Sequence, residues 1–371
     1  MKFSCNQQTL AKALNIVSKA VTSRTTIPIL KGILLKVNSD GTLTMSASDL
    51  DLGIEKTFEV EDSQEGEIVV QAKLFGDIIR KLPNDKITIE DIDGNILIKC
   101  ASSEFNIIGS PSDEFPKLNV PENEENRIVF DKETLKDMIR KTSFAASIDE
   151  SRGVITGILV EIKENSLNMV ALDGFRMAVA RQSLNNNRSE NIIIPAKIFN
   201  EIAKIISETE SEKDTVDLYM SEKRAIFIID DTRVVLRLLN GEFVKYQDIL
   251  PKESQTRVVL NKNDFLESIE RASLLAKVGK NNLIKLDIRE NNIEITSKSE
   301  EGNVKEDVII SKEGNNLVIG FNSKYLIDAL KVIDDEEINI LFNSSVSPCL
   351  IKPLSGDAYE YLVLPVRITN N

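Results

Sequence analysis

The stretch QAKLFGDIIRKL, residues 71–82, places apolar side chains at the three- and four-residue spacing of an amphipathic helix. Similar stretches follow as PAKIFNEIAKII at residues 195–206 and NSKYLIDALKVI at residues 322–333. The second copy begins 124 residues after the first, and the third begins 127 residues after the second. Self-similarity at a nearly fixed period is typical of a repeated folding unit, so we expect three copies of one unit.

Three further markers recur at equivalent places and indicate what each unit contains. Each copy begins with an Asn or Asp suited to capping a helix, continues into a strand with alternating apolar residues, and turns into a returning strand. These markers lie at residues 5–10, 33–37 and 43–45, then at 130–135, 158–162 and 167–169, and then at 260–265, 284–288 and 293–295. Each unit therefore holds two helices and otherwise mostly strands.

The period is too long for a solenoid, whose repeats run about 20–50 residues and cannot bury a core alone. The chain of 371 residues also exceeds the roughly 250–300 residues at which a single core stops growing. Polar, proline-bearing joins at residues 117–127 and 248–257 separate the copies. We therefore predict three similar α+β domains, at residues 1–125, 126–251 and 252–371.

Composition excludes several classes of chemistry. The chain has no histidine, which rules out Ser-His-Asp and Cys-His catalysis and histidine-ligated zinc. Cys5, Cys100 and Cys349 lie far apart in the sequence and are predicted to be buried reduced thiols. Polar residues interrupt the N-terminal apolar stretch, and no stretch reaches the roughly 18 apolar residues of a membrane span. We expect a soluble cytoplasmic protein.

Positive charge is concentrated in the predicted helices. The six helical stretches together carry a net +8, which leaves −21 on the rest of a chain whose total is −13. Two explanations account for this split equally well. The lysines lie on ordinary solvated helix faces, or they form a basic surface that faces phosphates without regard to base sequence. Aromatic residues make up only 5% of the chain, too few to suggest a platform that stacks single-stranded bases.

The stretch ALDGFRMAV, residues 171–179, admits three interpretations: a hairpin turn, an acid and base pair, or the edge of a docking site. Its counterparts are ASDLDLGIE at residues 47–55 and SKSEEGNVK at residues 297–305, so the strand connection is common to all three units. Asp173 and Gly174 are therefore predicted to form a hairpin turn. Only the middle unit continues with Gly-Phe-Arg-Met, which favours a docking role in addition to the turn.

Metal-dependent chemistry has little support in the sequence. DIDGN at residues 91–95 lacks the glycine and glutamate spacing of a calcium loop and is predicted to be a hairpin turn. The pairs Asp49 with Asp51 and Asp230 with Asp231 could hold magnesium, which leaves a metal-dependent hydrolase as the weakest hypothesis. The sequence contains no GxxxxGK phosphate loop, so ATP hydrolysis is not expected.

Eight segments spread along the whole chain carry a family resemblance: MKFSCNQQTLAKAL, TTIPILKGILLKV, SASDLDL, SPSDEFPKL, VALDGFRMAV, NGEFVKYQDILP, IGFNSKYLIDAL and YLVLPVRI. In this order and spacing they resemble the bacterial sliding clamp, the beta subunit of DNA polymerase III. The resemblance implies three clamp domains, each with two helices packed on antiparallel sheets, and a head-to-tail dimer that forms a ring around duplex DNA. It implies a processivity factor that tethers the replicative polymerase, without catalysis, cofactor or metal.

The resemblance assigns basic residues to the face toward DNA. They are Arg24, Lys73, Arg80, Lys197 and Lys12. The loop at residues 147–155 lies where the family touches DNA. Here it carries Asp149, Glu150 and Gly153, which disfavours a close contact.

The resemblance also predicts the seam of the homodimer. It would place Lys73, Phe105 and Ile107 of one chain against Leu274 and Leu275 of the other. A head-to-tail contact of this kind closes into a ring only if its rotation divides a full circle.

In this family, the polymerase III catalytic subunit, the clamp loader and repair polymerases insert short linear peptides into a groove between the middle and last domains. The matching residues are Ile155, Leu172, Gly174, Phe175, Arg176, Met177, Val244, Ile249, Asn322, Tyr325, Pro348, Leu362, Leu364 and Val366. Phe175 stands where relatives often have a histidine, Leu172 where they have a threonine, and Val244 where they have a proline. We therefore predict a more apolar groove, with Phe175, Arg176 and Met177 at its lip. The alternative function is a protein-interaction hub that does not encircle DNA.

Overall fold

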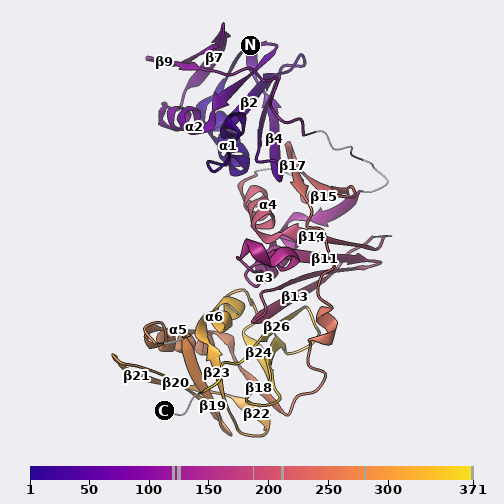
Figure 1. The fold of residues 1–371 in the computed structure, drawn as a ribbon, viewed down its shortest axis with the longest axis vertical. Helices are drawn as coiled ribbons and strands as arrows, with labels where there is room; N and C mark the ends of the chain where they lie inside the picture. Colours follow the sequence, from indigo (N-terminus) through magenta and orange to yellow (C-terminus); the bar gives the residue numbers. More distant parts are fainter. Residues whose placement is uncertain (119–121, 123–126, 187, 210–212, 280, 369–371) are drawn as a thin grey trace. The chain divides into compact units, whose positions relative to one another are not determined.

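The computed structural model describes residues 1–371 except 119–121, 123–126, 187, 210–212, 280 and 369–371 (Figure 1). The chain divides into two compact units, one formed by residues 1–133 with 201–238 and the other by residues 134–200 with 239–371. The predicted domain boundary between residues 125 and 126 lies outside the described residues. No helix among the described residues combines the length and the apolar character needed to cross a membrane.

The first unit contains two antiparallel sheets. The five-stranded sheet has the order β5 (Glu61–Gln64), β1 (Lys2–Asn6), β7 (Lys86–Ile92), β8 (Asn95–Cys100), β9 (Ser103–Ile108). The eight-stranded sheet has the order β10 (Ile128–Asp131), β15 (Thr215–Met220), β16 (Arg224–Ile229), β17 (Thr232–Arg237), β4 (Leu52–Glu59), β3 (Thr42–Ser48), β2 (Gly32–Val37), β6 (Gly66–Gln71). Helices α1 (Gln7–Val17) and α2 (Ala72–Lys81) lie side by side in this unit (Figure 1).

The second unit repeats this design. Its nine-stranded sheet has the order β14 (Glu190–Pro195), β11 (Gly157–Lys163), β12 (Ser166–Leu172), β13 (Arg176–Ser183), β26 (Tyr359–Val363), β25 (Cys349–Pro353), β24 (Glu337–Phe342), β18 (Thr256–Asn261), β22 (Ser311–Gly314). Its four-stranded sheet has the order β21 (Gly302–Ile309), β20 (Asn292–Ser299), β19 (Leu283–Ile288), β23 (Leu317–Asn322). Helices α5 (Lys262–Ala276) and α6 (Ser323–Lys331) pack together here, whereas α3 (Lys132–Ser143) and α4 (Ala196–Glu208) each begin in one unit and end in the other.

The repeated elements predicted from the sequence are confirmed, two helices in each copy. The predicted caps of α1 and α5 are made: the side chain of Asn6 accepts from the amide of Gln8, and that of Asn261 accepts from the amides of Asn263 and Asp264. These bonds satisfy amides that the first turn of a helix leaves without a backbone partner. The local sequence therefore sets where these helices begin.

Two sheets continue from one repeat into the next with the same register. Strand β17 of the second repeat pairs with β4 of the first, with Val234 opposite Ile54. Strand β26 of the third repeat pairs with β13 of the second, with Tyr361 opposite Ala178. Each join thus uses the same two strands of the repeat, and each repeat shares a sheet with its neighbour in the chain.

The cores are apolar, and the three cysteines lie within them. Cys5, Cys100 and Cys349 are buried and free, as predicted. Burial raises the pKa of the Cys5 and Cys349 thiols to about 12. A thiol that holds its proton so strongly is a poor nucleophile and a poor metal ligand.

Candidate protein-docking site

The candidate site is built around the turn from β12 to β13. The amide of Asp173 donates to the carbonyl of Arg176 at 3.2 Å, and Oδ1 of Asp173 accepts from the amides of Phe175 and Arg176 at 2.9 and 3.0 Å. Gly174 has φ +89°, a conformation that suits glycine. The predicted hairpin turn is confirmed, and its aspartate holds the turn by accepting hydrogen bonds.

Arg176 joins this turn to helix α6. Its Nε donates to Oδ2 of Asp173 at 3.0 Å, and its Nη1 donates to Oδ2 of Asp328 at 2.6 Å. The guanidinium also lies 4.7 Å from the ring centroid of Tyr325 and 5.5 Å from that of Phe144. With its side chain only 10% exposed, Arg176 is held in place and organises the site from within.

Phe175 forms the exposed part of the turn. It is 54% exposed and stacks on Tyr325, with ring centroids 6.0 Å apart and an interplanar angle of 17°. Burial and the nearby carboxylate of Asp173 raise the pKa of Tyr325, so its phenol keeps its proton at neutral pH. The pair therefore presents a rigid aromatic surface to solvent.

An apolar cluster, which we call the floor, adjoins the turn through Leu172 and Met177. It contains Leu172, Met177 and Leu362 together with Leu159, Val170, Val179, Ile193, Tyr246 and Leu350, and Val154, Ile155, Leu239, Phe243, Leu250 and Leu341 pack against it. Met177 is 3% exposed, so its predicted place at the lip is wrong. The reason is the alternation of the hairpin: Met177 lies opposite buried Leu172 and shares its inward face.

A buried polar pair supports this floor. The hydroxyl of Tyr246 donates to Oε2 of Glu161 at 2.7 Å, and Nδ2 of Asn168 donates to the same oxygen at 3.0 Å. Burial alone would raise the pKa of Glu161, but the hydrogen bonds from Asn168 and Tyr246 outweigh it and lower that pKa. The phenol of Tyr246 has a raised pKa because it is buried against this carboxylate.

The other predicted groove residues fall into two groups. Val244, Ile249 and Leu364 are exposed apolar side chains, whereas Pro348 and Val366 are partly buried. The amide of Leu364 donates to the carbonyl of Phe175 at 2.9 Å, which fixes the C-terminal segment against the turn. Asn322 caps α6 by accepting from the amide of Lys324. Its side chain therefore has a structural role in the helix that carries Tyr325.

Three residues at the site were not predicted: Arg152, Phe144 and Asp328. Arg152 donates through Nη1 to the carbonyl of Asp173 and lies over Gly174, where an added Cβ would come within 3.1 Å of its Nη2. No local sequence signal marks these residues, because their partners lie on other elements of the fold.

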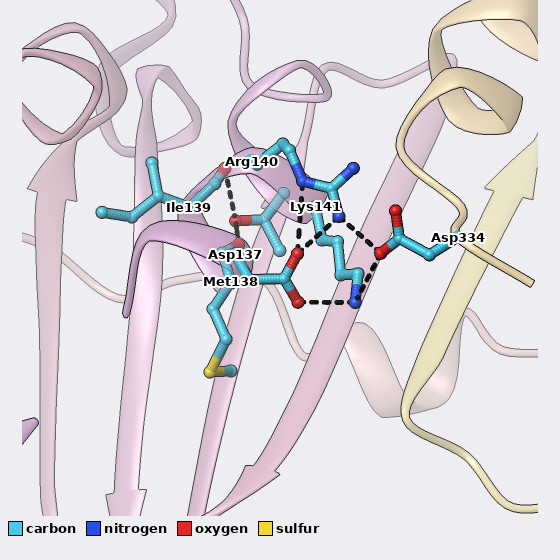
Figure 2. A network of polar contacts seen from close by, with 7 residues as sticks. Asp137, Met138, Ile139, Arg140, Lys141 and Asp334 are labelled. Atoms are coloured by element: carbon cyan, nitrogen blue, oxygen red, sulfur yellow. Dashed lines mark hydrogen bonds and ion pairs between the residues drawn. The ribbon is translucent and has the colours of Figure 1, made fainter. Parts of the chain in front are cut away.

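A second polar network lies on the same unit (Figure 2). Nη2 of Arg140 donates to Asp137 at 2.5 Å and to Asp334 at 2.6 Å, and Nζ of Lys141 lies 2.5 Å from Asp137 and 3.5 Å from Asp334. Although partial burial opposes it, the bond from Arg140 lowers the pKa of Asp334. The network joins the end of α3, in the second repeat, to the segment after α6, in the third.

The residues predicted to face DNA are all exposed. Lys12 lies on α1, Lys73 and Arg80 lie on α2, Lys197 lies on α4, and Arg24 lies in a bend after α1. Arg80 makes an i,i+3 ion pair with Asp77 at 2.7 Å, which offsets its charge.

Lys73, Lys197 and Lys324 occupy the second position of the second helix in their repeats. All three are exposed, and none makes an ion pair within the described residues. They lie where a helix N-terminus already carries a partial positive charge. In the loop at residues 147–155, Asp149 accepts from the hydroxyl of Ser151 at 2.7 Å and from its amide at 3.0 Å, and these two bonds lower the pKa of Asp149.

Apart from Lys73 on α2, the predicted seam residues lie on two free sheet edges or beside them. Phe105 and Ile107 are on β9, an edge strand of the five-stranded sheet, and Phe105 is 40% exposed. Leu274 and Leu275 are on α5, which packs against the edge strand β21, and Leu274 is 66% exposed. An exposed edge strand offers unpaired backbone groups to another chain.

The carboxylates considered for metal binding have other partners. Oδ1 of Asp49 accepts from the amides of Asp51 and Leu52 at 3.1 and 2.7 Å. Asp230 and Asp231 form ion pairs with Lys132 and Lys56. Across the described part of the chain, no three His, Cys, Asp or Glu residues are grouped to hold a metal. DIDGN is the predicted hairpin turn between β7 and β8, with Ile92 opposite Asn95.

Three family profiles match consecutive parts of the chain: the N-terminal domain of the DNA polymerase III beta subunit over residues 1–119, its central domain over 129–245, and its C-terminal domain over 247–367. The beta sliding clamp of Halalkalibacterium halodurans is 38% identical, and that of Bacillus subtilis strain 168 is 36% identical. Each match covers 99% of this chain and 100% of the relative.

Solved structures of similar proteins share the fold over nearly the whole chain. The sliding clamp from Bacillus subtilis has a TM-score of 0.93 at 35% identity and is covered completely, as is this chain. A putative DNA polymerase III beta subunit from Eubacterium rectale has a TM-score of 0.93 at 38% identity, covering 99% of this chain and 100% of that one. The repeated domains define a clamp fold. The chain belongs to the DNA polymerase III beta subunit family, the beta sliding clamps.

Proposed function

We propose that this protein is a sliding clamp that encircles duplex DNA as a head-to-tail dimer and tethers the replicative polymerase and other replication and repair proteins. The observation that carries the proposal is the repeated sheet join. Two of the three joins that a three-repeat chain can make are present within the chain, and the strands for the third are both free edges, β9 and β21. A partner chain supplies the missing strand at each end, so two chains close a ring.

The repeat equivalence also gives the register of the third join. In each repeat, four residues on neighbouring strands lie opposite one another in a row across the sheet, and the last residue of the row is on the strand that makes the join. The three rows are Phe3, Ile89, Ile98 and Phe105 in the first repeat, Ile128, Leu218, Phe227 and Val234 in the second, and Val258, Ile340, Ile351 and Tyr361 in the third. Phe105, Val234 and Tyr361 are therefore equivalent.

The other side of the join is a strand of the neighbouring repeat, and its hairpin gives the register. Three cross-strand pairs are equivalent in the three repeats: Ala47 with Ile54, Ala171 with Ala178, and Ser297 with Val304. Val304 of the third repeat therefore corresponds to Ile54 and Ala178. The two intrachain joins place Val234 opposite Ile54 and Tyr361 opposite Ala178. The dimer join therefore places Phe105 of one chain opposite Val304 of the other.

Neighbouring side chains support this register. With Phe105 opposite Val304, the antiparallel pairing sets Glu104 opposite Lys305, two opposite charges on exposed positions. Phe144, which contacts Tyr361 edge to face at 5.6 Å, is the repeat equivalent of Leu274. By the same equivalence, Leu274 packs on Phe105 across the dimer seam.

The basic residues on the helices supply the inner surface of the ring. Lys73, Lys197 and Lys324 recur once per repeat and would attract phosphates at regular intervals without contacting base edges. Arg24, Arg80 and Lys12 add to this surface. Such contacts hold the duplex inside the ring and permit movement along it.

The aromatic pair Phe175 and Tyr325 and the apolar floor form the site for linear peptides from polymerases and the clamp loader. An aromatic surface beside exposed Val244, Ile249 and Leu364 provides anchors for apolar peptide side chains.

The protein acts in the cytoplasm, at the nucleoid, as a non-catalytic scaffold. A separate ATP-driven loader opens its ring. We also propose three clamp domains, at residues 1–125, 126–251 and 252–371, in keeping with the three family profiles that match the chain in succession.

The register is tested by cross-linking the double variant Phe105→Cys with Val304→Cys under mild oxidation. We expect a covalent dimer in which a disulfide bond closes each of the two seams. The matched control is Ser103→Cys with Val304→Cys, which shifts one partner by two residues and should cross-link poorly. Equal cross-linking of the two variants would contradict the register.

Encirclement is tested by loading the cross-linkable ring onto nicked circular DNA with the cognate loader. After oxidation, the ring should remain on the circle in high salt and leave once the circle is cut. Equal retention on circular and linear DNA would favour a hub that binds DNA without encircling it.

A further inference from the structure

A small cavity lies at the join of the first two repeats, within the first unit. It has a volume of about 40 Å³. Its lining includes Leu50, Asp51, Pro116, Lys117, Arg224 and Arg237. A cavity of this size holds a few water molecules or one group as small as a carboxylate.

The turn beside this cavity repeats the turn of the docking site bond for bond. The amide of Asp49 donates to the carbonyl of Leu52 at 3.0 Å, and Oδ1 of Asp49 accepts from the amides of Asp51 and Leu52. The amide of Arg237 donates to the carbonyl of Asp51 at 2.8 Å, as that of Leu364 does to Phe175. The cavity is therefore the repeat counterpart of the peptide site.

One residue of this turn is strained. Leu50 has φ +80°, at the position that Gly174 occupies with φ +89° in the other turn. A non-glycine residue in this conformation costs about 1 kcal/mol. Leu50 is also 53% exposed and contributes apolar surface to the lining of the cavity. Strained residues of this kind are concentrated at functional sites.

The side chains around the two sites differ in charge. Where the peptide site has Phe175, Pro348 and Leu364, the counterpart has Asp51, Arg224 and Arg237. Lys117 lies at the position of Lys245, in the aligned segments EFPKL and EFVKY. Three cations therefore surround the cavity with one carboxylate.

These cations are only weakly neutralised. Arg237 lies 3.7 Å from Asp51, and both side chains are more than 60% exposed. Lys117 and Arg224 are exposed and make no ion pair within the described residues. The cavity thus carries a net positive charge that an anionic group can neutralise.

The floor of the cavity is already filled, which excludes a large apolar ligand. Gly53 stands where the peptide site has Met177, and an added Cβ on Gly53 would lie 2.4 Å from Cδ2 of Leu118. Leu118 packs with Tyr219, Ile226 and Val235. The counterpart site therefore has no room for the aliphatic or aromatic anchor that the peptide site accommodates.

We propose that this cavity is a second docking point, which binds an acidic segment of a partner polypeptide through an aspartate or glutamate carboxylate held by Lys117, Arg224 and Arg237. The inference rests on the proposed function, in which partners bind as extended peptides. A peptide fits better than free phosphate because Leu50 and Pro116 flank the cavity with apolar surface that only a peptide side chain can contact. The carboxylate of Asp51 also repels a dianion more than a single carboxylate.

The test uses the full-length clamp and a fluorescein-labelled peptide with two adjacent aspartates between leucines. Its amide analogue, with asparagine in place of each aspartate, is the matched ligand. Fluorescence anisotropy at low salt should show the acidic peptide binding at least about tenfold more tightly. Arg224→Gln should weaken the acidic peptide about tenfold, whereas Arg289→Gln, an exposed arginine of the third repeat, should not.

The two docking points are separated by a second pair of measurements. Phe175→Ala should leave the acidic peptide unaffected, and Arg224→Gln should leave DNA retention and binding at the Phe175 site unaffected. Loss of the acidic peptide in Phe175→Ala would place it at the first site and overturn the proposal. Equal binding of acidic and amide peptides, or displacement by equimolar inorganic phosphate, would also overturn it.

Discussion

Nη1 of Arg176 donates to Oδ2 of Asp328 at 2.6 Å, and this bond joins the turn of one repeat to the second helix of the next. The arginine is 10% exposed and holds a second carboxylate, Asp173. Its guanidinium also lies over the aromatic rings of Tyr325 and Phe144. Arg176 is charged, yet it is held within the site and is its main structural support.

Replacing Arg176 with alanine should therefore destabilise the protein. The change leaves Asp173 and Asp328 without their partner, and loss of one member of a largely buried ion pair costs about 3–5 kcal/mol. The free energy of unfolding, measured with urea, should fall by an amount of this order. Arg289→Ala, which removes an exposed arginine paired with Asp287, should change it little. Equal effects of the two substitutions would show that Arg176 does not have this supporting role.

Phe175→Ala should weaken peptide binding without affecting the fold. Phe175 is half exposed and contacts Tyr325, so its removal takes away binding surface and leaves the floor intact. Affinity for a peptide from the replicative polymerase should fall about tenfold by fluorescence anisotropy. Dimerisation, measured by sedimentation, should be unchanged. Unaltered peptide affinity would place the site elsewhere.

Truncation of the C-terminus tests the same site from its other side. Leu362 is buried and lies opposite Met177 in the sheet, so a deletion that begins there would damage the fold. A deletion that begins at Leu364 removes a partly buried segment and its two amide bonds, from Leu364 to Phe175 and from Val366 to Gly320, while β26 remains. Peptide affinity should fall in this variant with little change in the thermal midpoint. A large loss of thermal stability would show that the segment is part of the core.

The sequence predicted the repeat, its helices and the hairpin turn because each depends on local patterns. Apolar spacing identified the helices, and Asn6 and Asn261 marked their starts. The same alternation of residues along the hairpin would have shown that Met177 faces inward with Leu172. That error came from assigning the whole Gly-Phe-Arg-Met motif to one surface.

Other parts of the site could not be predicted from local patterns. Asp328 lies 152 residues from Arg176 in the sequence, and nothing around it distinguishes it from other helix-borne aspartates. Phe144 and Arg152 likewise reach the site only through the pairing of β13 with β26 and the path of the loop at residues 147–155. Such contacts follow from the assembled sheet.

Phe105→Asp should convert the dimer to a monomer. The substitution places a charge on the free edge strand β9, opposite the position assigned to Val304, and a charge on an edge strand opposes pairing with another chain. Sedimentation equilibrium at micromolar concentration should show the change. Val346→Asp, at a side chain 74% exposed outside any strand, should remain dimeric. A dimeric Phe105→Asp variant would contradict the proposed seam.

Stability should fall as the pH rises above about 9. Burial raises the pKa of Cys5 and Cys349 from 9.0 to about 12, so the unfolded chain releases these protons first. Between pH 9 and 12 the unfolded state binds fewer protons than the folded state, and the free energy of unfolding therefore decreases with pH. Cys349→Ala should give a shallower decrease from pH 9 to 10, measured by urea unfolding at each pH, than the parent protein. An identical slope in the two proteins would show that the Cys349 thiol does not titrate on unfolding.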